Sequence, residues 1–234
     1  MNSDYWVDFW KNYTNNLVSQ DEQTQVLRTF NKTPIDDSLW EFTLETITSP
    51  LKLSQSDKVL ELCCGNGLIA RNIAERVNNV TAVDVSTNLI EELKKKNYKN
   101  INAFSMDIRK LDFDFQSFDK IVIYAGIQYL NEAETIAMFE KLYKWLKPNG
   151  ILFVGDIPDY DKIWDFYNSK EREKVFFDNR KLSKDIVGVW YKKDFFEKLC
   201  SYAGFKKYKI LKQHDKLIYS SFRYDLIATK GSNG

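Results

Sequence analysis

The stretch VLELCCGNG, residues 59–67, joins an apolar run to an acid, two cysteines and two glycines. Glycines between a buried strand and a helix let the backbone approach a ligand closely, with its amide N–H groups aimed at that ligand. A metal site or a disulfide suits these residues poorly, because the adjacent Cys63 and Cys64 cannot present tetrahedral geometry together with the single, distant His214. The stretch therefore predicts a turn that wraps around a ligand.

Acidic residues near this turn indicate the charge of the ligand. GNGLIA, from Gly65 onward, matches the dinucleotide-binding pattern, and Asp84 lies about 20 residues further on, where an acid would hold a ribose diol. This spacing alone leaves NAD open. Glu61, upstream of the glycines, would repel a diphosphate, whereas a ligand with an ammonium and a sulfonium would tolerate it. The residues favour a cationic ligand, with Asp107 placed to accept a hydrogen bond from an adenine amino group.

Recurring apolar runs predict the elements that position these residues. Strands alternate with helical stretches and are expected at residues 59–62, 80–84, 101–104, 120–125 and 151–155. Such alternation predicts a parallel sheet with crossover helices. The tail FKKYKILKQ turns at residues 214–216 and returns as LIYSSFRYDLIAT, which is a β-hairpin pattern. We expect a doubly wound α/β domain that ends in an antiparallel pair.

Composition limits the class of protein. With 234 residues, 44% of them hydrophobic, the chain suits one sizeable α/β domain. Lys and Arg number 34 against 33 Asp and Glu, so no global field draws the chain to nucleic acid or to an anionic membrane. No apolar run approaches the roughly 20 residues of a membrane span, and the start, MNSDYWVDFW, lacks the features of a signal peptide. We expect a cytoplasmic protein that recognises a small substrate.

Five motifs, in order and spacing, resemble those of the class I S-adenosylmethionine-dependent methyltransferases: VLELCCGNG, AVDVS, SMDIRKLDF, FDKIVIYAGIQYL and LKPNGILFVGDIP. The resemblance covers residues 57–157 and, more loosely, 191–230. It implies a Rossmann-like methyltransferase fold with a mostly parallel seven-stranded sheet, and S-adenosyl-L-methionine as the cofactor. It implies a cofactor site made of Glu61, Cys63, Gly65, Asn66, Gly67, Asp84, Val85, Asp107, Ile108 and Tyr124.

The same resemblance divides that site among the parts of the cofactor. The turn with Glu61 and its glycines is expected around the methionine portion, Asp84 on the ribose hydroxyls, and Val85, Asp107 and Ile108 against the adenine. Cys63 stands where the family usually has glycine. We expect both cysteines of the turn to be small, inert side chains, since free Cys is usually buried.

Polar residues beyond the later strands are the candidate catalytic groups. Methyl transfer from a sulfonium is an in-line displacement in which a protein mainly aligns the reactants, and it needs no metal. An oxygen acceptor benefits from a base, whereas an amine needs only to be deprotonated and desolvated. Asp156, after the fifth strand, and His214, in the hairpin turn, are the expected bases. Tyr13 is a candidate lid residue over the cofactor.

Two flanking regions are expected to decorate the single domain. Residues 1–50 read as a helical lid, with one stripe formed by Trp6, Trp10, Tyr13 and Leu17. Residues 157–190 read as a variable substrate cover, before a closing helix and hairpin over residues 191–230. The aromatic residues of this insertion either line an acceptor pocket or pack a small core of their own: Tyr160, Trp164 and Tyr167.

Four functions remain open from the sequence. The leading hypothesis is methyl transfer to a hydroxyl of a sugar or other metabolite, followed by N-methylation of an amine metabolite. An NAD-dependent oxidoreductase and a non-catalytic, methyltransferase-like structural subunit are the alternatives of other classes. Nucleic acid is not expected as the acceptor, because YAGIQY, residues 124–129, lacks the Pro-Pro-aromatic pattern of methyltransferases that act on base amines. No oligomeric state follows from the sequence.

Overall fold

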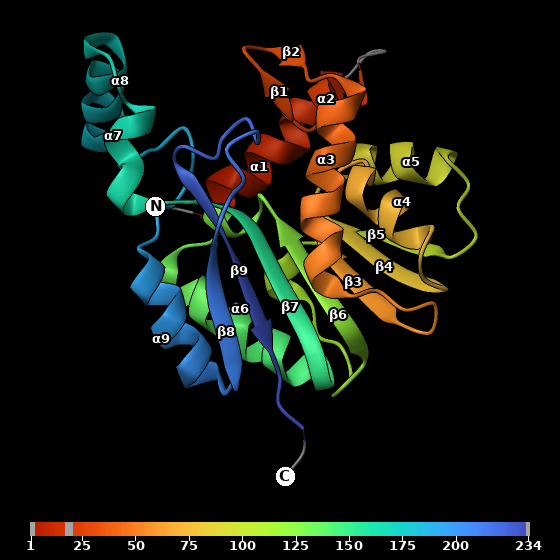
Figure 1. Ribbon diagram of the computed structural model, residues 1–234. Coiled ribbons are helices and arrows are strands. Elements are labelled where there is room, and N and C mark those ends of the chain that lie inside the picture. Colours follow the sequence, from red (N-terminus) through yellow and green to blue (C-terminus); the bar gives the residue numbers. More distant parts are fainter. Residues whose placement is uncertain (1–2, 17–20, 233–234) are drawn as a thin grey trace.

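A seven-stranded sheet organises the chain, of which the computed structural model describes residues 3–16 and 21–232. The strands follow the order β5-β4-β3-β6-β7-β9-β8 (Figure 1). They are β3 (Lys58–Leu62), β4 (Asn79–Asp84), β5 (Ile101–Ser105), β6 (Phe118–Tyr124), β7 (Leu146–Pro158), β8 (Lys207–Lys212) and β9 (Arg223–Thr229). Strands β3 to β7 are parallel, and β9 pairs antiparallel with both β7 and β8. The predicted fold class is confirmed.

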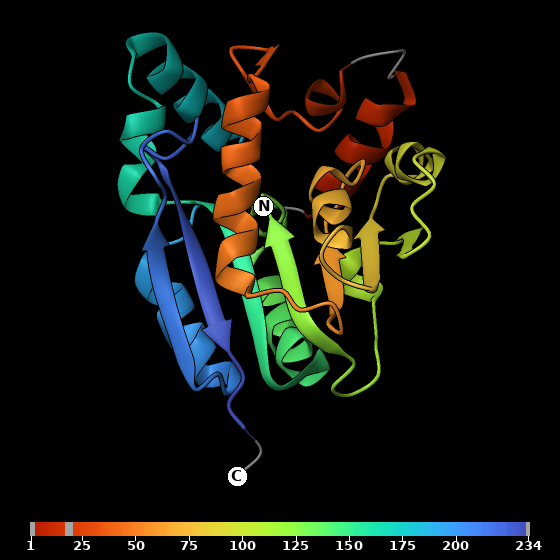
Figure 2. The ribbon, with the colours of Figure 1, turned by 45° about the vertical axis from the view of Figure 1, so that its right-hand side comes forward.

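Helices cover both faces of the sheet and explain why its central strands are continuous apolar runs. On one face lie α3 (Asp37–Thr48), α4 (Leu68–Ala74) and α5 (Thr87–Lys95), and on the other α6 (Glu132–Trp145) and α9 (Lys193–Ala203) (Figures 1 and 2). Val59, Leu60 and Leu62 of β3 are completely buried between these layers. The core therefore fixes the carboxyl ends of the parallel strands, where the site is expected.

The closing hairpin differs from its prediction in the connection. The sequence predicted a short turn at residues 214–216 and a strand from Leu217 onward. Instead β9 begins at Arg223, and the connection consists of turns, including a backbone hydrogen bond of 3.1 Å from Phe222 N to Tyr219 O. Phe222 is buried in a small aromatic cluster apart from the main core, so burial overrides the alternating pattern.

The N-terminal region is only partly helical. It contains α1 (Ser3–Tyr13), α2 (Glu22–Gln25) and the short 3-10 helices η1 (Thr14–Asn16) and η2 (Ser49–Leu51). A two-stranded ribbon of β1 (Thr29–Phe30) and β2 (Thr33–Pro34) precedes α3 and was not predicted. Leu17, the last member of the expected aromatic stripe, lies outside the described residues. The region lies across the end of the sheet toward which β6 points (Figure 2).

The insertion before α9 forms η5 (Tyr160–Lys162), α7 (Ile163–Phe166) and α8 (Lys170–Lys181), which stand away from the sheet (Figure 1). Tyr167 is buried in the aromatic cluster with Trp190 and Phe222. Tyr160 and Trp164 are about half exposed, at 48% and 50%. The insertion therefore packs a small core of its own, which is one of the two alternatives left open by the sequence.

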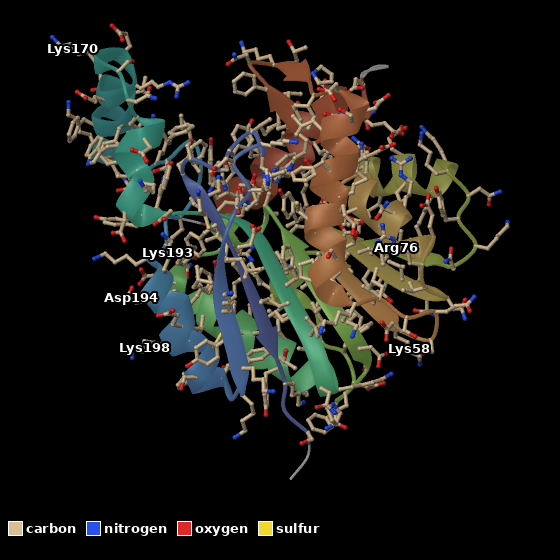
Figure 3. All side chains as sticks on the ribbon, in the orientation of Figure 1. Lys58, Arg76, Lys170, Lys193, Asp194 and Lys198 are labelled. Carbon is tan, nitrogen blue, oxygen red and sulfur yellow. The ribbon has the colours of Figure 1, made fainter. Side chains whose placement is uncertain are left out.

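The surface carries both signs of charge. Lys193, Asp194 and Lys198 project from the outer side of α9, and Lys170 from the far end of α8 (Figure 3). Within the described ranges, no helix combines the length and the apolar character that a membrane span requires.

Short 3-10 helices also connect strands and helices in the later part of the chain. They are η3 (Ile108–Lys110), η4 (Ile127–Tyr129) and η5, whose bounds are given above.

Helix α6 begins with a capping box, which offers a test of the fold. Asn131 accepts a hydrogen bond from Glu134 N, and Glu134 accepts one from Asn131 N, both at 3.0 Å. Asn131→Ala should cost about 1 kcal/mol, which lowers the melting temperature by roughly 2–4 °C in a domain of this size. Ser169→Ala is the matched control, because Ser169 caps α8, which buries none of its residues. An equal loss of melting temperature in the two variants would contradict the expectation that the cap of the buried helix α6 matters more than that of α8.

Candidate functional site

A cavity opens at the carboxyl ends of the parallel strands, beside the point between β3 and β6 where the strand order reverses. This is where doubly wound sheets bind ligands. It holds about 960 Å³ of space, its open mouth included. Its walls come from the ends of β3, β4 and β6, the loop after β5, and the N-terminal region.

The two glycines of the turn serve different neighbours. Gly65 lines the cavity with φ at +56°, and a Cβ atom there would lie 2.7 Å from Val26 Cγ1 of the N-terminal region. Gly67 does not line the cavity; its φ is +79°, and a Cβ atom would lie 2.3 Å from Leu93 Cδ1. Both positions therefore need glycine, because a side chain would overlap Val26 at the first and Leu93 at the second. Gly65 also leaves space on the side of the cavity.

Cys63 adopts a left-handed backbone conformation. Glycine adopts this conformation without strain, which explains why the family usually has glycine at this position. The φ of Cys63 is +59°, which costs a residue with a side chain about 1–2 kcal/mol. Gly126 makes room for that side chain, since a Cβ atom at Gly126 would lie 2.6 Å from Cys63 Sγ. Burial, followed by the charges of Asp84 and Glu61, raises the pKa of the Cys63 thiol well above its ordinary value. The thiol is protonated and inert at neutral pH, as expected.

Glu61 provides the clearest sign of a missing partner. Its side chain faces the cavity and is 2% exposed, and Oε2 has no hydrogen-bond partner in the described part of the chain. Burial, and then the charge of Asp84, raises the pKa of Glu61 well above its ordinary value. A buried carboxyl oxygen without a partner is costly. A cationic ligand group would supply both the hydrogen bond and the opposite charge.

Asp84 ties the end of β4 to the glycine turn. Its Oδ2 accepts a hydrogen bond of 2.9 Å from Gly65 N, and its Oδ1 accepts one of 2.8 Å from Ser86 N. Burial raises the pKa of Asp84, while these amide hydrogen bonds lower it. Each carboxylate oxygen has a further lone pair for a hydroxyl donor. Asp84 thus shapes the turn and lines the cavity at the same time.

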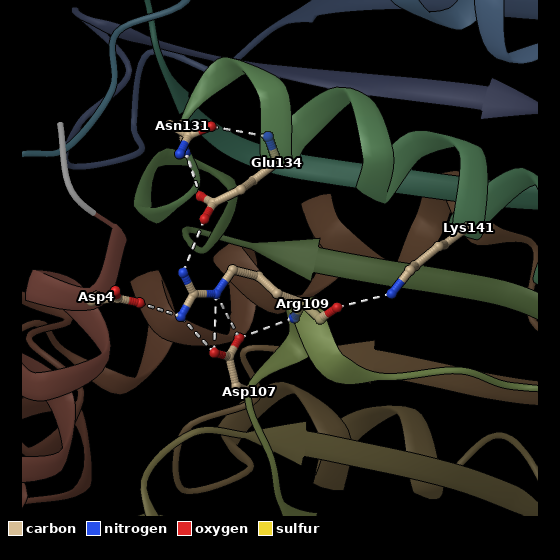
Figure 4. A network of polar contacts seen from close by, with 6 residues as sticks. All are labelled: Asp4, Asp107, Arg109, Asn131, Glu134 and Lys141. Atoms are coloured by element: carbon tan, nitrogen blue, oxygen red, sulfur yellow. Dashed lines mark hydrogen bonds and ion pairs between the residues drawn. The ribbon is translucent and has the colours of Figure 1, made fainter.

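Asp107 is held by Arg109, which was not among the predicted site residues (Figure 4). Arg109 donates from Nε and Nη2 to Asp107 at 3.0 and 2.6 Å, and it also binds Glu134 and Asp4 of α1. Burial would raise the pKa of Asp107, but the hydrogen bonds and charge of Arg109 hold it below its ordinary value. Asp107, Ile108 and Arg109 all line the cavity. The sequence contained a signal for this ion pair, since Arg109 lies two residues after Asp107 in the motif SMDIRKLDF.

The remaining expected cofactor residues also lie at the cavity. Val85 and Tyr124 line it. Asn66 lines it as well, but its Nδ2 donates to Glu22 O and Gln25 Oε1, both at 2.9 Å, so its amide group supports the N-terminal region. Apart from Gly67, every residue of the expected cofactor set therefore reaches one cavity.

The three expected catalytic residues do not line this cavity. Asp156 is buried beyond Arg28 and Tyr124, where it lines a smaller neighbouring cavity. His214 is exposed and lies edge-on against the ring of Phe42. Tyr13 stacks on aromatic neighbours of α1, and its hydroxyl donates to Thr24 O at 3.1 Å. None of the three therefore lies on the wall that carries the expected cofactor residues.

Residues of the N-terminal region form much of the cavity wall. Trp6, Val7 and Trp10 come from α1, and Val26, Arg28 and Trp40 follow them in the chain. Tyr129, after β6, completes an aromatic surface beside Trp6 and Trp10, with ring centroids 4.7 and 5.8 Å away. The N-terminal lid stays a prediction, and Arg28 and Trp40 carry no recognisable sequence signal.

Comparison with known proteins identifies the class to which this fold and site belong. A family model described as a methyltransferase domain matches residues 59–150. A protein of Bacillus subtilis whose name describes it as the methyltransferase YqeM is 26% identical over 180 residues, which cover 74% of this chain and 65% of that protein. A ubiquinone biosynthesis O-methyltransferase of Rickettsia akari is 30% identical over 121 residues, covering 50% and 47%. The chain spans less than two thirds of the length of these relatives.

A solved structure shares the fold over nearly the whole chain. It is phosphoethanolamine N-methyltransferase 1 of Haemonchus contortus in complex with phosphoethanolamine and S-adenosylhomocysteine. The TM-score is 0.73 at 17% identity, and the match covers 99% of this chain and 50% of that protein. The chain has the fold of an adenosyl-ligand methyltransferase. Its residues 59–150 match the methyltransferase domain, and its fold is that of the class I S-adenosylmethionine-dependent methyltransferases, whose cofactor is S-adenosylmethionine.

The residues present fit this cofactor. The unpartnered Oε2 of Glu61 lies in the cavity where a cationic group is needed, and Asp84 and Asp107 follow at the ends of the next two strands. Glu61 would face the ammonium and sulfonium of the methionine portion, Asp84 the ribose, and Asp107 with Ile108 the adenine. When bound, S-adenosylmethionine supplies a methyl group activated by the sulfonium.

Removing the carboxylate of Asp84 tests its assignment to the ribose. Asp84→Ala should weaken the binding of S-adenosylhomocysteine by about 10- to 100-fold, because it removes charge-assisted hydrogen bonds worth about 1.5–3 kcal/mol. Ser86→Ala is a control that leaves the carboxylate in place. Calorimetric titration of both folded variants measures the effect, and unchanged affinity in Asp84→Ala would refute the assignment.

A second variant separates packing from ligand space at the glycine turn. Gly65→Ala should weaken S-adenosylhomocysteine binding, because Ala at positive φ is strained by about 1–2 kcal/mol and its Cβ overlaps Val26. Adding Val26→Ala should restore part of the affinity. If the double variant binds no better than Gly65→Ala, the space beside Gly65 belongs to the ligand and not to Val26.

Proposed function

We propose that this chain transfers the methyl group of S-adenosylmethionine to a small-molecule acceptor that enters beside Tyr124 and Tyr129. The observation that carries the proposal is the division of one cavity into two parts. Glu61, Asp84 and Asp107 lie on the part formed by β3, β4 and the loop after β5. Aromatic side chains dominate the part next to β6 and the N-terminal region, which supports an acceptor with an apolar body.

The chain's own contribution is alignment and exclusion of water. Trp6, Trp10 and Trp40 cover the cavity from the N-terminal region, opposite the strand ends that hold the cofactor residues. Fixing two reactants in line can contribute about 7–11 kcal/mol to a displacement reaction. Removing water also strengthens the interaction of Glu61 with a cationic group. This mechanism needs no catalytic base.

The cavity bears on the choice of acceptor atom. Among its described lining residues there is no histidine or lysine, and Asp156 and His214 lie elsewhere. Burial raises the pKa of Tyr129 to about 12 and that of Tyr124 well above its ordinary value, so both hydroxyls stay protonated at neutral pH. An amine attacks as the neutral form and a phenol as the phenolate, each after losing a proton to solvent, so neither needs a base on the protein. We therefore propose such an acceptor ahead of the sugar hydroxyl that the sequence favoured.

The names of the relatives include methyl transfer to nitrogen and to oxygen. The Haemonchus contortus protein is named an N-methyltransferase and the Rickettsia akari protein an O-methyltransferase. A screen with methyl-tritiated S-adenosylmethionine against matched amines, phenols and sugars tests the proposal directly. We expect transfer to an amine or a phenol. Binding of S-adenosylmethionine without transfer to any class would instead support the non-catalytic, cofactor-binding subunit.

His214→Ala provides a sharp test of catalysis without a base. Because the imidazole is exposed and packs on Phe42 outside the cavity, the variant should keep kcat within about twofold at all pH values, whereas loss of a true base costs about 10²–10⁴-fold. The measurement is kcat against pH with the acceptor found in the screen. A large loss confined to neutral pH would restore His214 as the base.

A further inference from the structure

Arg28 is a buried cation on the cavity wall whose hydrogen-bonding capacity is mostly unused. It lies above the ring of Tyr124, with Cζ 4.8 Å from the ring centroid, and its side chain is 17% exposed. Its Nη1 donates to Asp156 Oδ2 at 2.8 Å, which is the single side-chain hydrogen bond that Arg28 makes to the described residues. A guanidinium group has five N–H donors in a planar fork. Most of these donors therefore remain for another acceptor.

Asp156 does not depend on Arg28 alone. Arg223 lies 3.8 Å from Asp156 Oδ2 and donates from Nη1 to Asp156 O at 2.6 Å, and Gln213 Nε2 lies 3.5 Å from Asp156 Oδ1. Burial would raise the pKa of Asp156, but Arg223 and Arg28 hold it below its ordinary value. Two arginines thus serve one buried carboxylate that is always ionised at neutral pH. Arg28 can engage a second anion while Asp156 keeps a counter-ion.

Arg28 lies on the acceptor side of the cavity. It lines both the main cavity and the smaller one behind it, with Tyr124 and Trp40 as the other shared walls. Tyr124 ends β6, and Asp156 belongs to β7, whereas the proposed adenosine residues lie on β4 and after β5, across β3. A ligand group beside Arg28 is therefore separated from Asp84 and Asp107 by the width of the central strands.

We propose that the methyl acceptor carries an oxyanion, a carboxylate or a phosphate, and that Arg28 binds it. Arginine suits this role because its planar fork matches both groups through two parallel hydrogen bonds. Tyr124 and Tyr129 line the same wall, and their protonated hydroxyls are further donors. The anion is a recognition handle, and the atom that receives the methyl group is a different one. This inference rests on the proposed methyl transfer and names its substrate class.

Binding of simple anions tests the inference without knowledge of the acceptor. The protein is saturated with S-adenosylhomocysteine and titrated with inorganic phosphate and with benzoate, using the fluorescence of the cavity tryptophans Trp6, Trp10 and Trp40. We expect at least one anion to bind, and Arg28→Gln to weaken it by about 10- to 100-fold, as loss of a charge-assisted hydrogen bond implies. The two anions distinguish a phosphate handle from a carboxylate handle. Absence of binding by both would overturn the inference.

Arg223→Gln is the matched control. It also removes one positive charge next to Asp156, but Arg223 does not line the main cavity. This variant should keep anion affinity within about threefold, because it leaves the guanidinium of Arg28 in place. Equal losses in both variants would mean that Arg28 acts only by stabilising Asp156, and would overturn the inference.

A second comparison separates the acceptor from the cofactor, which has a carboxylate of its own. S-adenosylhomocysteine and 5′-methylthioadenosine, which lacks that carboxylate, are titrated into wild type and Arg28→Gln. We expect the variant to bind both within about threefold of wild type. A selective loss of S-adenosylhomocysteine would assign Arg28 to the cofactor and overturn the inference, while leaving methyl transfer intact. Failure of wild type to bind S-adenosylhomocysteine would instead refute the proposed function.

Discussion

The hydrogen bonds of one buried carboxylate hold the site together. Asp84 accepts from Gly65 N and Ser86 N, and so joins the turn after β3 to the start of α5. Together with the backbone hydrogen bonds from Cys64 N to Val83 O and from Gly67 N to Cys64 O, this link keeps Cys63 and Gly65 in left-handed conformations, which carry a cost for Cys63. Because the turn is fixed, Glu61 faces the cavity with an unpartnered oxygen. The proposed preference for a cationic ligand group rests on this arrangement.

The N-terminal region is tied to the sheet at several points around this turn. Val26 packs on Gly65, Arg28 pairs with Asp156, and Asp4 reaches Arg109 at the far end of the cavity. Tyr219 adds a hydrogen bond of 2.6 Å to Thr29 O. The N-terminal region therefore does more than cover the cavity. It also contributes the aromatic wall and the positively charged side chain of Arg28.

Local patterns predicted the strands, the glycine turn and the acids at strand ends, because each depends on residues close together in the chain. Periodicity identified all five parallel strands, and spacing identified Asp84. The pair of Arg28 and Asp156 has no such signal, since 128 residues separate its members. The ribbon of β1 and β2 was missed because strands of two residues show no period. His214 was placed on the rim because the hairpin connection was expected to be shorter than it is.

The central claim is that the cavity binds an adenosyl ligand with a cationic methionine end. Calorimetric titration of the full chain with S-adenosylhomocysteine and with NAD tests it most directly. We expect one bound S-adenosylhomocysteine per chain and no binding of NAD, because the unpartnered Oε2 of Glu61 can accept a hydrogen bond from an ammonium group, whereas a diphosphate offers it no donor. Binding of NAD without S-adenosylhomocysteine, or binding of neither, would contradict it.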